Sequence, residues 1–336
     1  MKHFISIIYM LFASAMLSNC STKSAFIENS GSVFGTYYSI VYESQKNYND
    51  AFYSIFMQIN NAVSSYQLHS EISRFNTQGF LNNPSPILLE QLKSAAYYHQ
   101  ITNGAFEPTL LPLIEVWGFG LKKRTKVEGA TIDSLLPLIS FTKNISFNKK
   151  VIKANKPGVQ LSLTSMGEGY TLNKIASFLD HKGIENYKVE LGGEVKCKGK
   201  NEHNEVWRIG ISNPLYDLEK SPEELTEIII LNNNSLSTSG SYRKFYIDEH
   251  GRKKTHIIDP KTGYPVTHNL LSVSIKCPDA EKADALSTAC MVMGVLKAKQ
   301  FIKEQKDIEG FLIFENDKKE LETWASTNFY QIVYKK

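Results

Sequence analysis

Runs of strand-like and helix-like sequence follow one another in this chain without strict alternation. Residues 33–43 are rich in β-branched and aromatic side chains and predict a strand, and 50–64 carry apolar residues at a helical period. A second helix is predicted to begin at Ser85, a common N-cap residue, and to end at Asn103. A doubly wound parallel fold needs a helix after nearly every strand. The order of the runs therefore favours an α+β fold with a largely antiparallel sheet.

The second half of the chain continues this mixture. Helices are predicted at 169–182, 278–294 and 296–305. Short strands are predicted at 150–163 (two runs around a Pro-Gly pair), 187–191, 206–212, 226–231, 270–276, 310–315 and 323–334. A polar, charged loop is expected at 216–224.

Composition narrows the class of protein. The chain has 336 residues, of which 42% are hydrophobic, so it can bury the core of one large or two medium domains. A net charge of +4 does not suggest a protein that binds nucleic acid. The four cysteines form no CxxC pair, which argues against a structural zinc site, and we expect no essential disulfide.

The first segment is predicted to be a targeting signal rather than part of the folded domain. Residues 1–19 combine a basic start with an uncharged apolar stretch, as in a secretory signal peptide. The run Leu17–Cys20 resembles a bacterial lipobox, in which the cysteine is lipidated at a cleaved N-terminus. Residues 20–30 would then be a lipid-anchored tether on the periplasmic face. The alternative is a plain cleaved signal, and either one places the protein outside the cytoplasm.

The familiar nucleotide and hydrolase motifs are missing: there is no P-loop, no GxGxxG after a strand, no HExxH and no GxSxG. A different oxygen-rich group stands in a predicted helix. Asp284 and Thr288 are four residues apart and share a face, with Ser287 beside them. Mg²⁺ prefers oxygen ligands and a phosphate to complete its shell. The alternative is a helix-terminal charge with two small packing residues.

Two further segments could act on a phosphate. Residues 238–243 combine hydroxyls, a glycine and Arg243, which suits an anion, although a polar strand end would look the same. Residues 255–265 place His256 and Asp259 before a Pro/Gly turn, where an imidazole could move protons near neutral pH. A surface histidine is the alternative there.

Two glycine-rich segments could bind a ring system or an anion. Aromatics and glycines at 104–120 could form a flat slot, or simply a loop around the core. Residues 161–170 pass from a strand-like run into a helix whose N-terminus could face an anion. Glu168 at that start could accept from a ribose or a base amine instead.

The order of these blocks gives more information than any one of them. FGT, SSY, SEISRFN, GAFEPT, WGFG, LTSMGEGY, ELGGEVKCKG, STSGSYRKF, THIIDPKTGYP and ADALSTACMVMG together resemble the ApbE family, the FAD:protein FMN transferases, from about Gly31 to the C-terminus. The resemblance implies one domain over 31–336, built of two intimately packed mixed α/β subdomains with FAD between them. It also implies Mg²⁺-dependent transfer of FMN from FAD to a Ser or Thr hydroxyl, releasing AMP. Typical targets are subunits of Nqr- or Rnf-type membrane redox pumps.

The resemblance also implies site residues. His256 would be the general base, with Asp259 orienting it or sharing that role. The metal would be held by Asp284, Thr288 and an oxygen of Ser165; Ser287 stands where some members have a further Asp. Contacts to FAD would fall at Phe34, Tyr66, Ala105, Phe106, Glu107, Ser162, Glu168 and Ile258, with Arg243 on the phosphates.

Two rival readings stay open at this point. Water could replace the protein hydroxyl, which would make the chain an FAD pyrophosphatase that releases FMN and AMP. The chain could also be a non-catalytic, FAD-binding lipoprotein. Without the resemblance, the residues support only a secreted α+β protein with a possible Mg²⁺-phosphate site.

Overall fold

A single eight-stranded antiparallel sheet organises the molecule, in the order β1-β2-β6-β7-β10-β13-β14-β15. The computed structural model describes residues 25–121, 126–214, 225–242 and 244–329. The strands of the sheet are β1 Ala25–Val33, β2 Thr36–Ser44, β6 Tyr187–Leu191, β7 Glu194–Lys198, β10 Asn234–Gly240, β13 Leu270–Cys277, β14 Glu309–Glu315 and β15 Leu321–Ala325. The expectation of an α+β fold with a largely antiparallel sheet is confirmed.

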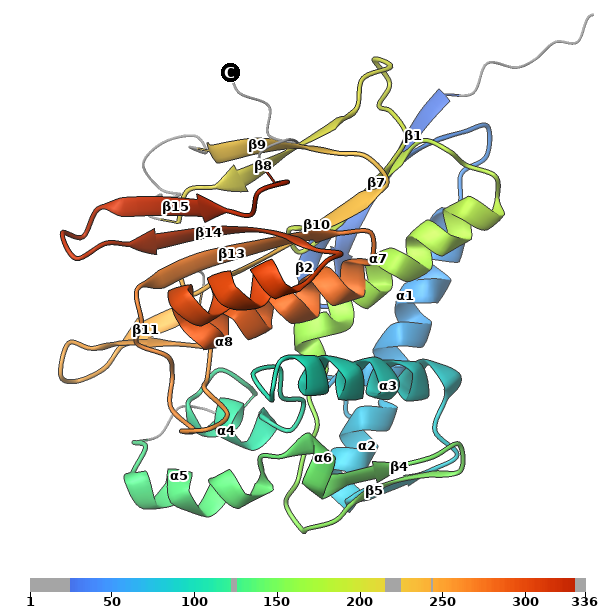
Figure 1. Ribbon diagram of the computed structural model, residues 1–336. Helices are drawn as coiled ribbons and strands as arrows, with labels where there is room; N and C mark the ends of the chain where they lie inside the picture. The colour runs from blue at the N-terminus through green and yellow to red at the C-terminus, as the bar shows by residue number, and fades with distance from the viewer. Residues whose placement is uncertain (1–24, 122–125, 215–224, 243, 330–336) are drawn as a thin grey trace, which may run out of the picture.

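Both faces of this sheet are covered. Helices α7 (Thr164–His181) and α8 (Ala280–Glu304) pack on one face, and the hairpin of β8 (Trp207–Ser212) and β9 (Leu225–Leu231) packs on the other (Figure 1). In β14, Leu312 joins the core under α8, while its neighbours in the strand face the hairpin. This alternation is the period of two that a strand imposes on its side chains.

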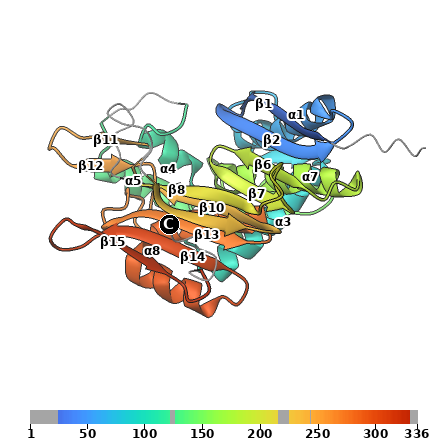
Figure 2. The ribbon, with the colours of Figure 1, turned by 90° about the horizontal axis from the view of Figure 1, so that it is seen from above.

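The rest of the chain forms a mainly helical part that packs against α7 and α8 (Figure 1) and lies largely beneath the sheet when the molecule is seen from above (Figure 2). It contains α1 Asn49–Val63, α2 Glu71–Gln78, α3 Pro86–Ile101, α4 Leu111–Val116, α5 Gly129–Leu135, the 3₁₀ turn Leu136–Leu138, α6 Phe141–Asn144 and a small sheet of β3 Phe80–Asn82, β5 Val151–Ala154 and β4 Ile145–Phe147. A two-stranded ribbon of β11 (Phe245–Ile247) and β12 (Lys253–Thr255) stands apart from these sheets. Because Ala285 and Ala289 of α8 share a core cluster with α3, the two parts are intimately packed.

Helices α7 and α8 cross at Gly169. A Cβ added there would lie 2.2 Å from the carbonyl oxygen of Ala280 and 2.8 Å from the Cβ of Asp284. Contacts that short are sterically forbidden, so only glycine allows the two backbones to come this close. The crossing brings the first turns of α8 beside the N-terminal half of α7.

Helix α8 contains a break at Gly294, whose φ of 74° lies in the left-handed region. The ring of His268 caps this break, because its Nε2 lies 2.8 Å from the Met291 carbonyl. Among the described helices, α8 alone has the length and mean hydropathy of a membrane span, yet 56% of its apolar window is buried in the protein, as in a core helix.

Several sequence predictions need correction. Helix α7 begins at Thr164 rather than Gly169, and residues 155–163 form no strand. Residues 25–30, which the sequence assigns to a tether, are the first part of β1 and pair with β2. The last described strand, β15, ends at Ala325, so residues 326–329 of the predicted strand 323–334 form no strand. Residues 330–334 and the polar loop at 216–224 lie outside the described residues.

Candidate active site

Asp284 lies on α8 where that helix crosses α7, and its side chain is nearly inaccessible to solvent. The backbone amide of Gly169 donates a 3.0 Å hydrogen bond to its Oδ2. No lysine, arginine or histidine among the described residues forms an ion pair with this carboxylate. When this buried carboxylate ionises, no described cationic side chain offsets its charge.

Two more carboxylates lie close to Asp284. Glu168 precedes Gly169 on α7 and reaches the β6–β7 turn, where a Cβ added to Gly192 would lie 2.4 Å from its Oε2. Burial, and then the nearby Glu168, raises the pKa of both Asp284 and Glu194. The Ser237 hydroxyl donates to Glu194 Oε1 over 3.2 Å. Two buried carboxylates, Asp284 and Glu194, therefore lie close to the half-buried Glu168, and a cation there would stabilise their charged forms.

Hydroxyl groups lie on the other side of Asp284. Ser287 is fully buried and donates a 2.9 Å bond to the Asp284 carbonyl. Ser239 of β10 lies 2.8 Å from the Ser287 hydroxyl and 3.1 Å from that of Thr288. Thr288 is only half-buried, unlike its neighbours in the helix. The Ser287 hydroxyl is thus bound to protein groups, and Thr288 is the hydroxyl of this helix turn that is open to a ligand.

These side chains fit a hard cation. Asp284 supplies a charged oxygen and Thr288 a neutral one, one helical turn apart, and Ser165 lies half-buried in the first turn of α7. Within the described ranges, no group of three or more His, Cys, Asp or Glu side chains is arranged to hold a metal. A Mg²⁺ site commonly takes one or two carboxylates and completes its shell with substrate phosphates and water. The predicted ligands Asp284 and Thr288 suit that arrangement. The hydroxyl of Ser287, the further predicted ligand, is instead bonded to the Asp284 carbonyl and to Ser239.

His256 follows β12 and is fixed by a backbone carbonyl. Its Nδ1 lies 3.0 Å from the Lys244 carbonyl, and its ring meets the edge of Phe119. A carbonyl only accepts hydrogen bonds, so Nδ1 carries the proton and Nε2 of the neutral ring has a free lone pair. Burial lowers the pKa of His256, which favours this neutral form. The ring is thus prepared to accept a proton at Nε2.

Asp259 makes no hydrogen bond or ion pair with His256 among the described contacts, so the structure gives no support to an orienting role for it. Its Oδ1 accepts a 2.8 Å bond from the Lys261 amide, and its own amide bonds to the Tyr264 carbonyl. Both bonds close the Pro/Gly turn, as aspartate often does. The Lys244 carbonyl takes the orienting position on His256 instead. A share for Asp259 in proton transfer stays a prediction.

Two predicted flavin contacts are aromatic and accessible. Phe34 lies in the tight β1–β2 turn at a φ of 55°, and its half-buried ring meets the edge of Phe56. Tyr66 follows α1 and is 56% exposed. An accessible aromatic ring can stack on or meet the edge of a flat ligand ring. The geometry of both residues suits contact with a flat ring.

The segment Ala105–Glu107 has a different character. Phe106 is buried in the core, edge-on to Tyr98, and Trp117 is buried as well, with its Nε1 bonded to the Gly263 carbonyl. The side chains of these aromatics therefore form no flat slot, and the core-loop alternative is the correct one for them. Ala105 is also buried. The side chains of Ala105 and Phe106 are therefore closed to a ligand.

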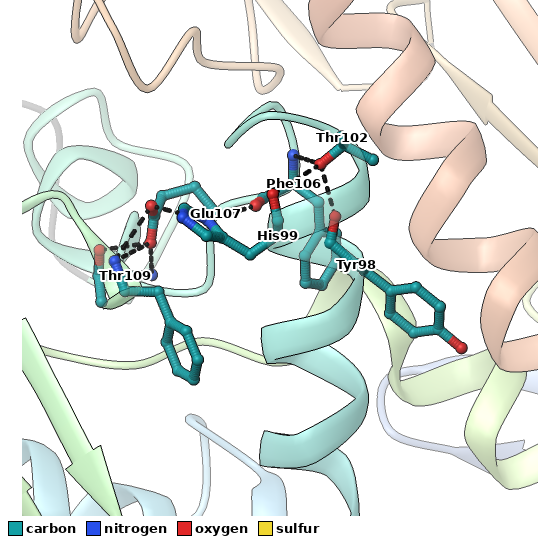
Figure 3. A network of polar contacts seen from close by, with 7 residues as sticks. Tyr98, His99, Thr102, Phe106, Glu107 and Thr109 are labelled. Carbon is teal, nitrogen blue, oxygen red and sulfur yellow. Dashed lines mark hydrogen bonds and ion pairs between the residues drawn. The ribbon is translucent and has the colours of Figure 1, made fainter. Parts of the chain in front are cut away.

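Glu107 is a buried anchor between three segments (Figure 3). Its Oε1 accepts from the Thr109 amide at 2.9 Å and hydroxyl at 2.6 Å and from the Phe141 amide at 3.1 Å. His99 Nδ1 lies 3.3 Å from Oε2 and 3.0 Å from the Phe106 carbonyl. These bonds tie α3 and α6 to the loop that carries Glu107. An open cavity of about 690 Å³ lies beside it, but neither Asp284 nor His256 lines that cavity.

We expect Glu107→Gln to destabilise the protein by about 1.5–3 kcal/mol, because the new amide group would face N–H donors where a carboxylate oxygen now accepts. Urea unfolding measures the change in free energy. Glu128→Gln, on an exposed carboxylate, is the control and should shift stability by less than about 0.5 kcal/mol. Equal stability of the two variants would show that Glu107 is no anchor.

The remaining predicted residues fall in varied places. Ser162 is buried, and its hydroxyl lies 3.0 Å from that of Thr164. Ile258 belongs to a small core cluster with Leu113, so its side chain is closed to a ligand. Arg243 and Cys20 lie outside the described residues. The sequence does not single out Glu194, and it offers Ser239 only as one hydroxyl of the possible anion site at 238–243. The sheet brings Glu194 close to Asp284 and Ser239 to Ser287 and Thr288.

Comparisons with known proteins agree on one assignment. The model of the ApbE family matches residues 34–312. A Haemophilus influenzae protein named FAD:protein FMN transferase is 32% identical, over 94% of each chain. A Vibrio cholerae protein of the same name is 30% identical, over 94% of this chain and 95% of the relative. The structure titled flavin transferase ApbE from Vibrio cholerae superposes with a TM-score of 0.81 at 28% identity, over 92% of this chain and 99% of that one. The ApbE protein of Thermotoga maritima gives 0.80 at 26% identity, over 93% and 100%.

The fold and the acidic site between α7 and α8 therefore define an enzyme of the flavin transferase class, with α+β architecture. The chain belongs to the ApbE family.

Proposed function

We propose that this chain transfers the FMN half of FAD to a Ser or Thr hydroxyl of a target protein with the help of Mg²⁺. The observation that carries the metal part is Asp284, a buried carboxylate that pairs with no cationic side chain in the described ranges, one helical turn from the half-buried Thr288. Membership of a family whose relatives are named FAD:protein FMN transferase supports the flavin part.

The reaction is a displacement at phosphorus. The target oxygen forms a bond to the FMN-side phosphorus, the bond from that phosphorus to the bridging oxygen breaks, and AMP leaves. His256 accepts the hydroxyl proton at Nε2, which the Lys244 carbonyl keeps free by binding Nδ1. Asp284, Thr288 and an oxygen of Ser165 would hold Mg²⁺, which supplies charge neutralisation at the phosphates when bound.

The contacts to FAD are assigned to predicted residues according to which of their groups are accessible. Phe34 and Tyr66 would contact the ring system, and the backbone of Ala105–Glu107 and Ile258 would contact the rest of FAD. Arg243 would balance phosphate charge. Ser162 and Glu168 complete the proposed set, at the start of α7.

The cellular setting is also part of the proposal. Its support is the signal-like segment 1–19 and the lipobox-like cysteine at position 20. Lipidation of Cys20 would hold the enzyme on the periplasmic face of a membrane, close to membrane redox subunits of the Nqr or Rnf type. Labelled fatty acid that enters the wild-type chain but not Cys20→Ser tests the anchor.

The transfer itself is tested with purified enzyme, FAD, Mg²⁺ and a flavoprotein domain of the Nqr or Rnf type. Intact-mass spectrometry follows the target, and chromatography follows AMP and FMN. We expect an FMN-sized mass increase on the target, with one AMP per flavin. AMP and free FMN with an unmodified target would support the pyrophosphatase reading. Bound FAD that never turns over, with several targets, would support a flavin carrier.

A further inference from the structure

We propose that Ser239 is a positioning residue that orients the Thr288 hydroxyl toward the bound cation. The proposal rests on the proposed function, in which Thr288 is a metal ligand. A hydroxyl binds a cation through a lone pair, so its proton must point to another acceptor. Ser239, from β10, provides that acceptor from outside the helix that carries Thr288.

The direction of these hydrogen bonds follows from the Asp284 carbonyl, which can only accept. The Ser287 hydroxyl lies 2.9 Å from the Asp284 carbonyl, which can only accept, so Ser287 gives its proton there. Ser239 lies 2.8 Å from that same hydroxyl and must therefore donate to it. Having given away its own proton, Ser239 can only accept from Thr288, 3.1 Å away.

The Thr288 hydroxyl does not make the bond that is usual for a threonine in a helix. A threonine inside a helix often donates to the carbonyl four residues earlier, which for Thr288 is that of Asp284. Ser287 already donates to that carbonyl, and the described contacts of the Thr288 hydroxyl include the bond to Ser239 and none to a carbonyl of its own helix. With Thr288 donating to Ser239, the lone pairs of its oxygen are turned toward the accessible side, since Ser287 behind it is fully buried.

The support for Ser239 is rigid. Ser239 sits within β10, where its backbone pairs with Val273 of β13. This pairing fixes the position of the Ser239 hydroxyl relative to α8. The preceding residue, Thr238, directs its hydroxyl to Ser274 of β13, 2.7 Å away, and makes no contact with Thr288. Thr238 is therefore a matched control in the same strand.

The experiment measures binding of Mn²⁺ to the full chain, purified in detergent without FAD, from the electron paramagnetic resonance signal of free Mn²⁺. We expect Ser239→Ala to weaken the affinity by about 10- to 100-fold, as loss of an outer-shell partner does. Thr238→Ala should leave the affinity unchanged. Urea midpoints of all variants confirm that the comparison is between folded proteins.

A double-mutant cycle separates positioning from a general structural effect. If Ser239 acts through Thr288, Ser239→Ala causes no further loss of Mn²⁺ affinity in a Thr288→Val background. Wild-type affinity in Ser239→Ala, or an equal loss in both backgrounds, would overturn the proposal. If Thr288→Val alone leaves Mn²⁺ binding unchanged, the metal site of the proposed function is wrong and the role of Ser239 falls with it.

Discussion

His256→Ala is expected to slow FMN transfer by about 10²- to 10⁴-fold while FAD still binds, because a positioned general base contributes that much to a proton transfer. The loss should appear in the rate of the chemical step, because the proposed role of the His256 ring is to accept the hydroxyl proton and not to bind FAD. Burial lowers the pKa of His256 below its ordinary value of 6.5, so the neutral base persists as the pH falls. The acid limb of the pH–rate profile should therefore lie below pH 6.5 in the wild type and vanish in the variant.

Single-turnover kinetics with target in excess measure this effect, and FAD binding is followed separately by fluorescence. His250→Ala is the matched control, because it removes an exposed imidazole from the same β11–β12 ribbon. It should transfer FMN at the wild-type rate. Near-normal transfer by His256→Ala would remove the general-base assignment, whatever the fate of the metal site.

Asp284→Asn is expected to abolish Mg²⁺-dependent transfer and to weaken metal binding by more than about 100-fold, since even outer-shell partners are worth about 10- to 100-fold. The change removes the charged oxygen of the site. The pKa of Asp284 is raised by burial and by Glu168, so metal binding near neutral pH must displace a proton. Metal affinity should therefore increase with pH in the wild type, and this dependence should be weaker in the variant.

Calorimetric titration in buffers of different ionisation enthalpy counts the released protons. Asp307→Asn is the control. The Asp307 carboxylate is largely exposed, and it pairs with Lys282, which lies on α8 as Asp284 does. It should bind Mg²⁺ like the wild type. Turnover of Asp284→Asn that matches the wild type, with or without a chelator, would exclude the metal role.

Some elements of the fold could be predicted because local rules decide them. The break in α8 was predicted between 294 and 296 because glycine ends helices, and Gly294 does have a left-handed conformation. The start of α7 was misplaced because Gly169 looked like the end of a loop. That glycine is in fact required by the crossing with α8, where a Cβ would meet the Ala280 carbonyl. Helix crossings depend on distant residues and leave no local pattern.

The candidate site likewise combines residues that a local pattern predicts with residues that only the fold brings together. The four-residue spacing of Asp284 and Thr288 was enough to place them on one face of a helix. Burial of the Phe106 ring and the anchoring bonds of Glu107 depend on α3 and α6, so a local motif suggested a ring slot that does not form. Ser239 meets α8 only because β10 lies beside β13 in the sheet.

The most direct test of flavin transfer follows oxygen atoms. The reaction is run in ¹⁸O-labelled water with FAD, Mg²⁺ and the target, and mass spectrometry reads the label in AMP and in the flavin phosphate. Transfer to a hydroxyl takes its new oxygen from the target, so we predict a flavinylated target and AMP that both lack ¹⁸O. Label in the phosphate of FMN or of AMP would show attack by water, and would contradict the account of this chain as a protein-modifying flavin transferase.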